Sequence, residues 1–425
     1  MEKDFHKVKH LFEEKPFVEG LRSTLERIPV PKHVFVDNRG DPQTAVIVVF
    51  RHTDLRIWFY FGGRADNKEF NKEFRKMLYQ EPFIKDKEEK PVEFWVELSN
   101  KDWEEGINSV LKDPNSEIRL YHEIKELKLK NWRDFIPEGY SVAPIDLSLK
   151  EKDHLKGDMY YNYLFYGALR THWFPFEEGL KDIRGFLLVR EDKEVVSFCI
   201  LGFLTKNNEI EVYGIGTLGE YRRRDFASIV GAATVEYCLP KYKSIRWVCT
   251  STNVGSYKTA EKIGYERIGE YKRARVYSNQ VNSWVANGFL RSINNVLESD
   301  TNNTLLLNHK ALILAILNRK EESIKIIQDL VEREPHDGNF YDTFGEILLI
   351  FHEYEDAIVK FQKALELEPN GWSETYLKMA ECYKELVNYK KTIEYAKKGR
   401  ELAIERKEEE WIKRADKLLF EMNKR

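Results

Sequence analysis

The sequence has 425 residues, of which 42% are hydrophobic and 33% charged, and its formal net charge is −3. This length predicts about two to four domains of roughly 100–200 residues each, and the apolar content excludes a disordered chain. The balanced charge provides no overall field for nucleic acid or anionic lipid, and the four cysteines form no CxxC pair, which argues against a disulfide framework and a zinc site.

The beginning of the chain carries no targeting signal that we recognise. Its first ten residues are too highly charged for a secretory signal, and no apolar run approaches the roughly 18 residues of a membrane span. We therefore expect a cytoplasmic protein with reduced thiols and no bound metal, which binds neither nucleic acid nor a membrane.

Residues 32–129 combine strand and helix patterns. Period-two apolar runs bounded by turn residues indicate strands, and a period near 3.6 indicates helices. Asn100 is a plausible N-cap for the second helix of this segment. The expected strands are 34–37, 45–50, 57–61, 92–97 and 118–127, and the expected helices are 69–79 and 101–111.

Residues 183–277 show the same order of elements. The expected strands are 185–189, 195–203, 210–217, 244–250 and 265–277, and the expected helices are 225–238 and 255–263. Two consecutive blocks with one order of elements suggest a tandem duplication of a mixed α/β unit.

From about residue 301 the strand signal disappears, and apolar residues recur at helical spacing. One helical hairpin is marked by Tyr341, Phe344, Gly345, Leu348, Ala357, Phe361, Ala364 and Pro369. Weaker copies lie 34 residues before it and 35 residues after it, and a helix at 408–422 follows.

This period resembles the tetratricopeptide repeat (TPR) family, whose consensus places aromatic, small and proline residues at these offsets. The resemblance implies a helical solenoid with a concave groove for a peptide or partner protein. The alternative is a solenoid that only packs on its own enzyme or dimerises it.

The sharpest local feature is the loop from Thr217 to Ala227, between an expected strand and an expected helix. It contains Arg222, Arg223 and Arg224. Unpaired N–H groups at a helix start favour an anion, and guanidinium groups match phosphate oxygens. The loop is therefore typical of a pyrophosphate site, and the alternative is a solvated basic turn.

Two motifs resemble the GNAT acetyltransferase superfamily. The spacing Arg222-x-x-Asp225-x-Ala227 is similar to its Gln/Arg-x-x-Gly-x-Gly/Ala loop. Asn253 and Ser256, followed by the segment 261–265 (Glu-Lys-Ile-Gly-Tyr), resemble its Asn-x-x-Ser…Lys-x-Gly-Phe segment. The resemblance covers about residues 137–279.

Residues 1–279 resemble a tandem GNAT type in which a degenerate half precedes the catalytic one. The segments 17–21, 36–37 and 67–71 carry that similarity, and the first-half loop 62–67 lacks the arginine run, so no cofactor is expected there. We predict a degenerate GNAT-like domain at 1–135, a catalytic domain at 136–285 and a TPR-like domain at 286–425. The fold class is thus tandem α/β (α+β) GNAT-like mixed sheets followed by an all-α solenoid.

The GNAT resemblance implies an N-acetyltransferase, which moves an acetyl group from acetyl-coenzyme A (acetyl-CoA) to a primary amine of a small molecule or a protein. It further implies a role for each motif. The backbone of Ile215, Gly216 and Thr217 would bind the pantetheine arm, which Asn253 and Ser256 would also approach. The loop amides at Ala227 and the arginines 222–224 would hold the pyrophosphate.

The same resemblance suggests catalytic residues. Glu211 stands where the family often has a general base, acting directly or through a water, and partial burial would raise its pKa toward the working range. A solvent-facing strand residue is the alternative. The family's usual tyrosine acid corresponds to Ala260, so either Tyr257, one turn earlier, or water would protonate the thiolate. Asp225, where the family prefers glycine, would cap the helix or repel the pyrophosphate.

The acceptor site is the least defined part. An aromatic cluster at 172–176 and the basic run 272–275 are candidates for lining it, with core packing and solvent exposure as their respective alternatives. A second overall hypothesis is a catalytically weak or inactive GNAT scaffold, in which the TPR-like domain carries an interaction or regulatory function.

Overall fold

The computed structural model describes residues 7–12, 32–51, 56–79, 83–86, 92–98, 100–151, 155, 179–278, 280–298, 300–368 and 372–424. The chain divides into two compact units. The first comprises Met1–Gln80 and Val92–Ser278, and the second comprises Glu81–Pro91 and Asn279–Arg425. The predicted motifs at 17–21 and 172–176 lie outside the described residues.

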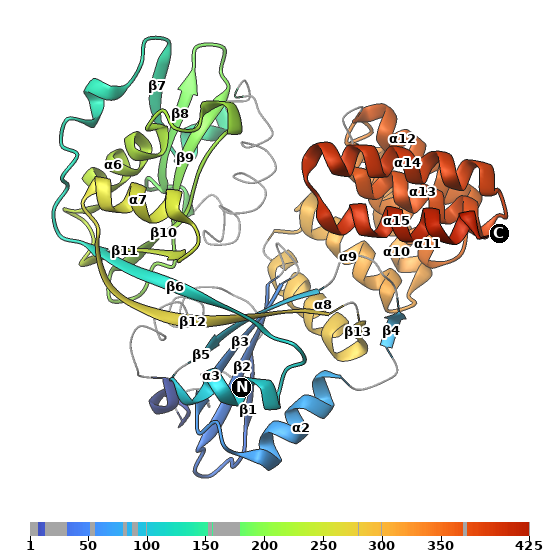
Figure 1. Cartoon of the computed structure of the whole chain (residues 1–425), viewed down its shortest axis with the longest axis horizontal. Helices are drawn as coiled ribbons and strands as arrows, with labels where there is room; N and C mark the ends of the chain where they lie inside the picture. Colours follow the sequence, from blue (N-terminus) through green and yellow to red (C-terminus); the bar gives the residue numbers. More distant parts are fainter. Residues whose placement is uncertain are drawn as a thin grey trace. The chain divides into compact units, whose positions relative to one another are not determined.

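The first unit is built on a single mixed sheet of eleven strands (Figure 1). Its strands are β1 (Lys32–Val36), β2 (Thr44–Arg51), β3 (Arg56–Gly63), β5 (Val92–Leu98), β6 (Asn115–Ile124), β7 (Tyr140–Pro144), β8 (Gly185–Arg190), β9 (Val195–Gly202), β10 (Glu209–Thr217), β11 (Ser244–Thr250) and β12 (Glu266–Ser278). Its helices are α2 (Lys68–Leu78), α3 (Asp102–Gly106), α6 (Phe226–Cys238) and α7 (Val254–Ile263). Short 3-10 turns lie at η2 (Lys9–Phe12), η3 (Ile107–Ser109), η4 (Trp132–Phe135), η5 (Leu147–Glu151) and η7 (Gly219–Tyr221).

The two halves of this unit exchange a strand. The sheet order is β1-β2-β3-β5-β12-β6-β11-β10-β9-β8-β7. Strand β12 of the second half pairs with β5 of the first, and β6 of the first half pairs with β11 of the second. Strands β6 and β12 pair with each other antiparallel in the middle of the sheet (Figure 1). The predicted order of elements in both halves is confirmed. The two halves nevertheless share one sheet, because a strand of each half pairs with a strand of the other.

Element ends differ from the sequence predictions in a few places. The helix expected at 101–111 ends at Gly106 and continues as the 3-10 turn η3. Lys101 occupies the position before the first helical residue, yet Asn100 Oδ1 still accepts the Trp103 N–H at 3.3 Å. The strand expected at 118–127 is β6, which begins at Asn115 and ends at Ile124. These ends follow from its pairing with β11 on one edge and β12 on the other.

The core of the second half lies between the sheet and helix α6. This helix is buried on most sides and packs on β8, β9 and β10. Strand β9 is buried along its whole length, as is β2 in the first half. Because both faces of each strand are buried, their sequences are nearly continuous apolar runs rather than alternating ones. Burial on both faces fixes the strands that carry the site described below.

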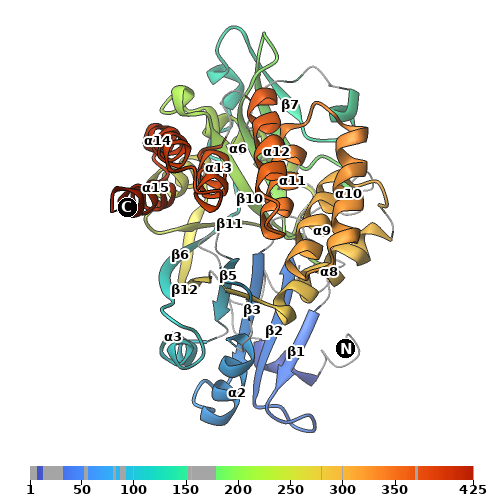
Figure 2. The same ribbon diagram turned by 90° about the vertical axis from the view of Figure 1, so that its right-hand side faces the viewer.

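In its described residues, the second unit consists of helices (Figure 2) and one small sheet (Figure 1). Strand β4 (Phe83–Asp86) pairs antiparallel with β13 (Gln280–Asn282). The helices are α8 (Ser283–Leu297), α9 (Thr304–Ile316), α10 (Lys320–Arg333), α11 (Gly338–Ile350), α12 (Tyr354–Leu367), α13 (Ser373–Glu385), α14 (Tyr389–Arg406) and α15 (Glu409–Asn423). Helices α9 to α14 pack as three successive pairs, which correspond to the three predicted repeats. The final helix expected at 408–422 is α15.

Small residues lie where the paired helices approach most closely, as the repeat pattern predicts. A Cβ atom at Gly345 would lie 2.6 Å from the Phe361 ring, and one at Gly399 would lie 3.0 Å from the Leu377 side chain. In the first pair, Ser323 Oγ donates to the Ala311 carbonyl at 2.7 Å. The helical unit is therefore a TPR-like stack.

Candidate functional site

Strands β10 and β11 part in the middle of the sheet. They pair in parallel only from Glu209–Ser244 to Val212–Trp247. Strand β10 then continues to Thr217 beside β9, with a register shift at Tyr213, whereas β11 continues to Thr250 beside β6. The edge of β10 that carries Ile215, Gly216 and Thr217 therefore makes no ladder with β11. We call residues 248–250 the open end of β11.

Close packing brings this part of β10 to helices α6 and α7. A Cβ atom at Gly231 of α6 would lie 2.5 Å from Ile263 Cδ1 and 3.6 Å from Ile215 Cδ1. On the opposite side, a Cβ atom at Gly216 would lie 2.8 Å from the Phe198 ring, so a larger side chain would displace this strand. The part of β10 that carries Ile215 and Gly216 is thus held between α6 and α7 on one face and β9 Phe198 on the other.

The arginine loop joins β10 to α6 and leaves backbone donors available. Arg223 and Asp225 adopt left-handed conformations, with φ values of 63° and 61°. Within the described residues, the N–H groups of Phe226, Ala227 and Ser228 at the start of α6 have no hydrogen-bond acceptor. Such a run of unpaired N–H groups at a helix start is a site for an anion.

The three arginines of this loop are exposed and differ in their contacts. Arg222 Nε donates to the Thr217 carbonyl at 3.2 Å, which fastens the loop to the end of β10. Arg224 lies over the Tyr221 ring at 5.6 Å. Arg223 has no ion-pair partner in the part of the chain that the structure describes. All three keep charged groups near the start of α6.

Asp225 does not cap the helix, so the sequence-based capping role is wrong. It occupies the N-cap position, but its side chain accepts no hydrogen bond from α6. The carboxylate instead pairs with Lys262 Nζ of α7 at 2.7 Å. The left-handed backbone explains why the family motif has glycine here, because glycine adopts this conformation without strain. It also explains why aspartate can replace it, because aspartate tolerates this conformation better than most residues. Lys262, the lysine of the second motif, thus balances the negative charge beside the anion site, a contact that the sequence did not predict.

Glu211 lies on β10 just before the strands part. It is half-buried, and its Cα pairs with Gly202 on β9 and Arg246 on β11. On the same face of its own strand, Glu209 is only 8% exposed and Tyr213 is half-buried, so this is not a solvent face. Glu211 also interacts electrostatically with Arg119 and Tyr271, which reach this face from β6 and β12.

The start of α7 holds the other predicted residues. Asn253 Oδ1 accepts the Ser256 N–H at 3.2 Å and so caps the helix. Ser256 Oγ in turn accepts the Trp247 indole N–H at 3.0 Å. Tyr257 is half-buried against the core of the second half, and Ala260 is fully buried. Asn253 and Ser256 therefore have structural contacts that fix the start of α7 above β11.

The corresponding strands of the first half do not part. Strands β3 and β5 pair from Ile57–Phe94 to Phe61–Leu98, and the pairing of β2 with β3 shows no register shift. A Cβ atom at Gly62, where the loop to α2 begins, would lie 2.6 Å from the Phe12 ring. The described residues of the first half thus show no opening like the one between β10 and β11.

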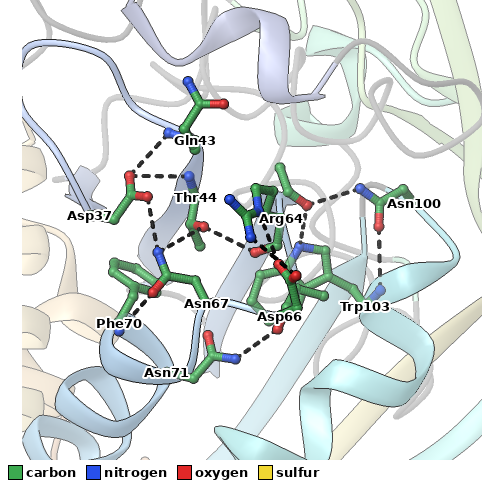
Figure 3. Close-up of polar contacts among 12 residues, drawn as sticks. Asp37, Gln43, Thr44, Arg64, Asp66, Asn67, Phe70, Asn71, Asn100 and Trp103 are labelled. Atoms are coloured by element: carbon green, nitrogen blue, oxygen red, sulfur yellow. Dashed lines mark hydrogen bonds and ion pairs between the residues drawn. The ribbon is translucent and has the colours of Figure 1, made fainter.

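Side chains occupy the first-half loop (Figure 3). Asp37 Oδ1 accepts the Gln43 and Thr44 N–H groups at 3.0 and 3.1 Å, and Asn67 Nδ2 donates to Asp37 Oδ2 at 3.0 Å. Asn67 Oδ1 accepts the Phe70 N–H at 3.2 Å and caps α2. At the start of α2, the side chain of Asn67 thus takes up the Phe70 N–H, whereas no side chain of α6 or its N-cap does this at the start of α6.

The basic run 272–275 does not face one surface. Lys272 pairs with Glu104 at 2.8 Å, whereas Arg273 is 3% exposed and bonds Glu117, which Arg275 also bonds. Arg273 and Arg275 point to the opposite side of the sheet from Lys272, because side chains alternate along a strand. The expectation of a shared acidic substrate or solvent face for this run is therefore wrong.

The described residues lack features that a metal site and a membrane-spanning helix require. They contain no group of three or more histidine, cysteine, aspartate or glutamate side chains placed to hold a metal ion. Among their helices, none combines the length and the apolarity that crossing a membrane requires.

Comparison with known families identifies the first unit. The GNAT acetyltransferase family matches residues 9–274, which is more than half of the chain. The chain belongs to the GNAT acetyltransferase family. In the helical unit, residues 352–423 match the family described as regulator of microtubule dynamics protein 1-3. No curated protein matches the chain.

Solved structures resemble the GNAT unit and the TPR-like unit separately. A GCN5-related N-acetyltransferase-like protein from Streptococcus suis is 20% identical, covers 65% of this chain and 99% of its own, and has a TM-score of 0.47. MamA from AMB-1 is 19% identical over 27% of this chain and 63% of its own, with a TM-score of 0.24. The TPR2B domain of yeast Sti1, solved as a complex with pHsp70, is 18% identical over 28% and 98%, with a TM-score of 0.26.

Proposed function

We propose that the chain is an acetyl-CoA-dependent N-acetyltransferase that acts on a primary amine of a small molecule or a protein. One observation carries the proposal: β10 and β11 part directly beside a helix start whose N–H groups are unpaired and whose loop presents three arginines. In the described residues of the first half, β3 and β5 pair without such an opening, and the loop before α2 has no run of three arginines.

The residues present fit acetyl-CoA. The edge of β10 at Ile215, Gly216 and Thr217 offers backbone groups for the pantetheine arm, although Arg222 already bonds the Thr217 carbonyl and Ser197 Oγ the Gly216 carbonyl. The N–H groups at Ala227 and its neighbours, together with the loop arginines, suit a pyrophosphate. Asn253 and Ser256 set the position of α7 near the pantetheine. When bound, acetyl-CoA supplies an acetyl group activated as a thioester.

In this proposal Glu211 removes a proton from the acceptor amine, directly or through a water, because an ammonium group has no lone pair for attack. Its half-buried place before the parting of the strands supports the role. Tyr257 or water returns a proton to the thiolate, since Ala260 has no group that can do so.

The TPR-like unit gives the proposal its second part. We propose that it binds a protein partner or contributes to assembly, and that it makes a protein acceptor a reasonable candidate beside small amines. The repeat pairs with close helix crossings support a stack of this kind.

Transfer of radiolabelled acetyl groups tests the proposal. Labelled acetyl-CoA is incubated with the protein and a cell extract, which is then separated into small and large molecules; labelled product in either fraction is the expected result. Glu211→Gln should lower the rate near neutral pH by roughly 100-fold or more, the usual range for loss of a general base. Binding of acetyl-CoA without transfer to any fraction would favour the inactive scaffold, and an unchanged rate would remove Glu211 from the mechanism.

A further inference from the structure

Arg119 belongs to the first half by sequence but lies beside the site of the second. Its strand, β6, stands between β11 and β12. The Arg119 Cα pairs with Thr250 on β11 and with Tyr271 on β12. Its side chain is 15% exposed, so the guanidinium group is held among protein atoms rather than in solvent.

The Arg119 guanidinium group binds the open end of β11. Its Nη1 donates to Thr250 Oγ1 at 3.0 Å, and its Nη2 lies 3.4 Å from the Val248 carbonyl oxygen as a second donor. Both acceptors lie beyond Trp247, where the pairing of β11 with β10 stops. The planar guanidinium group of Arg119 thus bridges the segment of β11 that no longer pairs with β10.

A half-buried carboxylate, that of Glu117, also contacts Arg119. Glu117 Oε1 lies 3.5 Å from Arg119 Nη1, and Glu117 also accepts hydrogen bonds from Arg273 Nε at 2.9 Å and Arg275 Nη2 at 2.8 Å. Burial opposes the charge of Glu117, but Arg273, Arg275 and Arg119 outweigh it and hold the pKa of Glu117 below its usual value. The anchor of Arg119 is therefore an ionised group.

The position of the open end of β11 matters for the proposed chemistry, because a displacement of about 1 Å can cost a factor of about 100 in a reaction that depends on orientation. A strand segment with hydrogen bonds on one edge only depends on its remaining tethers. Besides the backbone ladder to β6, the hydrogen bonds from Arg119 to Thr250 and Val248 are such tethers.

We infer that Arg119 is a positioning residue of the second-half site, which holds the open end of β11 at the distance from β10 that binding of acetyl-CoA requires. The inference rests on the proposed function. It makes the site composite, since the first half contributes a side chain to it through the exchanged strand.

Calorimetric titration with acetyl-CoA tests the inference, with Arg119→Met and Thr250→Val as separate variants. Arg119→Met should weaken binding about tenfold, the equivalent of about 1.4 kcal/mol and within the range for a hydrogen bond to a charged group. Thr250→Val should weaken it roughly threefold, as for the loss of one neutral contact. The double variant should bind no more weakly than Arg119→Met, because both changes remove the same tether. Arg119→Lys should restore part of the affinity.

Arg273→Met is the matched control. Arg273 bonds the same Glu117, but its side chain contacts Glu97, Glu117 and Trp95 rather than β11. We expect this variant to lower the thermal midpoint of the free protein and to leave the affinity for acetyl-CoA within about twofold of the unchanged chain.

The outcomes separate the two claims. If the unchanged protein does not bind acetyl-CoA, the proposed function fails and this inference fails with it. If the unchanged protein binds but Arg119→Met and Thr250→Val bind equally well, only the inference fails. Equal weakening by Arg273→Met would also overturn it, because the effect would then follow general loss of stability.

Discussion

At the scale of single residues, Asp225 shows how a departure from a family motif is accommodated. Its φ of 61° is the conformation for which glycine is favoured, and its carboxylate pairs with Lys262 instead of facing the helix start. The pair links the two sequence motifs, since Asp225 lies in the arginine loop and Lys262 lies in the second motif, in the last turn of α7. Neither motif alone indicated this contact.

The Asp225–Lys262 pair leads to a prediction about ligand affinity. Lys262→Met should weaken binding of acetyl-CoA several-fold, because an uncompensated carboxylate would stand beside the anion site. Asp225→Gly in the same chain should restore the affinity. Both side chains are largely exposed, so thermal stability should change little in either variant. Calorimetry measures the first effect and thermal unfolding the second; equal affinity in Lys262→Met and the unchanged chain would refute the role.

His122 leads to a prediction about pH. Its ring is 1% exposed, its Nδ1 lies 3.2 Å from the Trp247 carbonyl, and its Nε2 is buried without a partner. Burial lowers the pKa of His122 below its ordinary value of 6.5. As the pH falls, His122 is therefore protonated in the unfolded chain before it is protonated in the folded chain. Its contribution to the free energy of unfolding is present above pH 6.5 and declines as the pH falls below that value.

Thermal unfolding between pH 7.5 and 5 checks this expectation. The midpoint of the unchanged protein should fall more steeply with decreasing pH than that of His122→Gln, although the variant will be less stable at neutral pH. His336→Gln, on the exposed surface of the helical unit, serves as the control and should follow the unchanged chain. Parallel curves for His122→Gln and the unchanged chain would show that His122 contributes nothing to the pH dependence.

At the scale of elements, local patterns predicted most strands and helices of both halves. Apolar runs bounded by turn residues located β8 to β11, and helical periodicity located α6, α7 and the repeat pairs. The exchange of β6 and β12 could not be predicted, because pairing across a sheet depends on residues far apart in sequence. For the same reason the contact of Arg119 with Thr250, 131 residues later, had no signal in the sequence.

The exchanged strands predict that the two halves fold only together. A fragment of residues 136–425 lacks β6, so β11 and β12 lose the strand between them. We expect this fragment and a fragment of residues 1–135 to be insoluble when expressed separately and to form a soluble one-to-one complex when co-expressed. Gel filtration and mass determination would show it, whereas a soluble 136–425 fragment with a cooperative unfolding transition would contradict it.

At the scale of the whole molecule, the nearly neutral chain conceals a local concentration of charge. Arg222, Arg223 and Arg224 stand together at one helix start, and this cluster with the parted strands is the basis of the proposed function. The sequence predicted the cluster and its place between a strand and a helix. It did not predict which donors stay open, because that depends on the backbone conformation of the loop and on the ion pair of Asp225. The domain boundaries at residues 135 and 285 remain predictions.

The central claim is that one half of the tandem unit, and not the other, binds acetyl-CoA. Calorimetric titration of the unchanged protein with acetyl-CoA tests it most directly. We predict saturable binding of one molecule of acetyl-CoA per chain. The double variant Arg222→Ala with Arg224→Ala should weaken this binding at least tenfold. Arg39→Ala, at an exposed turn of the first half, should leave the affinity unchanged. No heat of binding, two molecules per chain, or equal binding by the double arginine variant would contradict it.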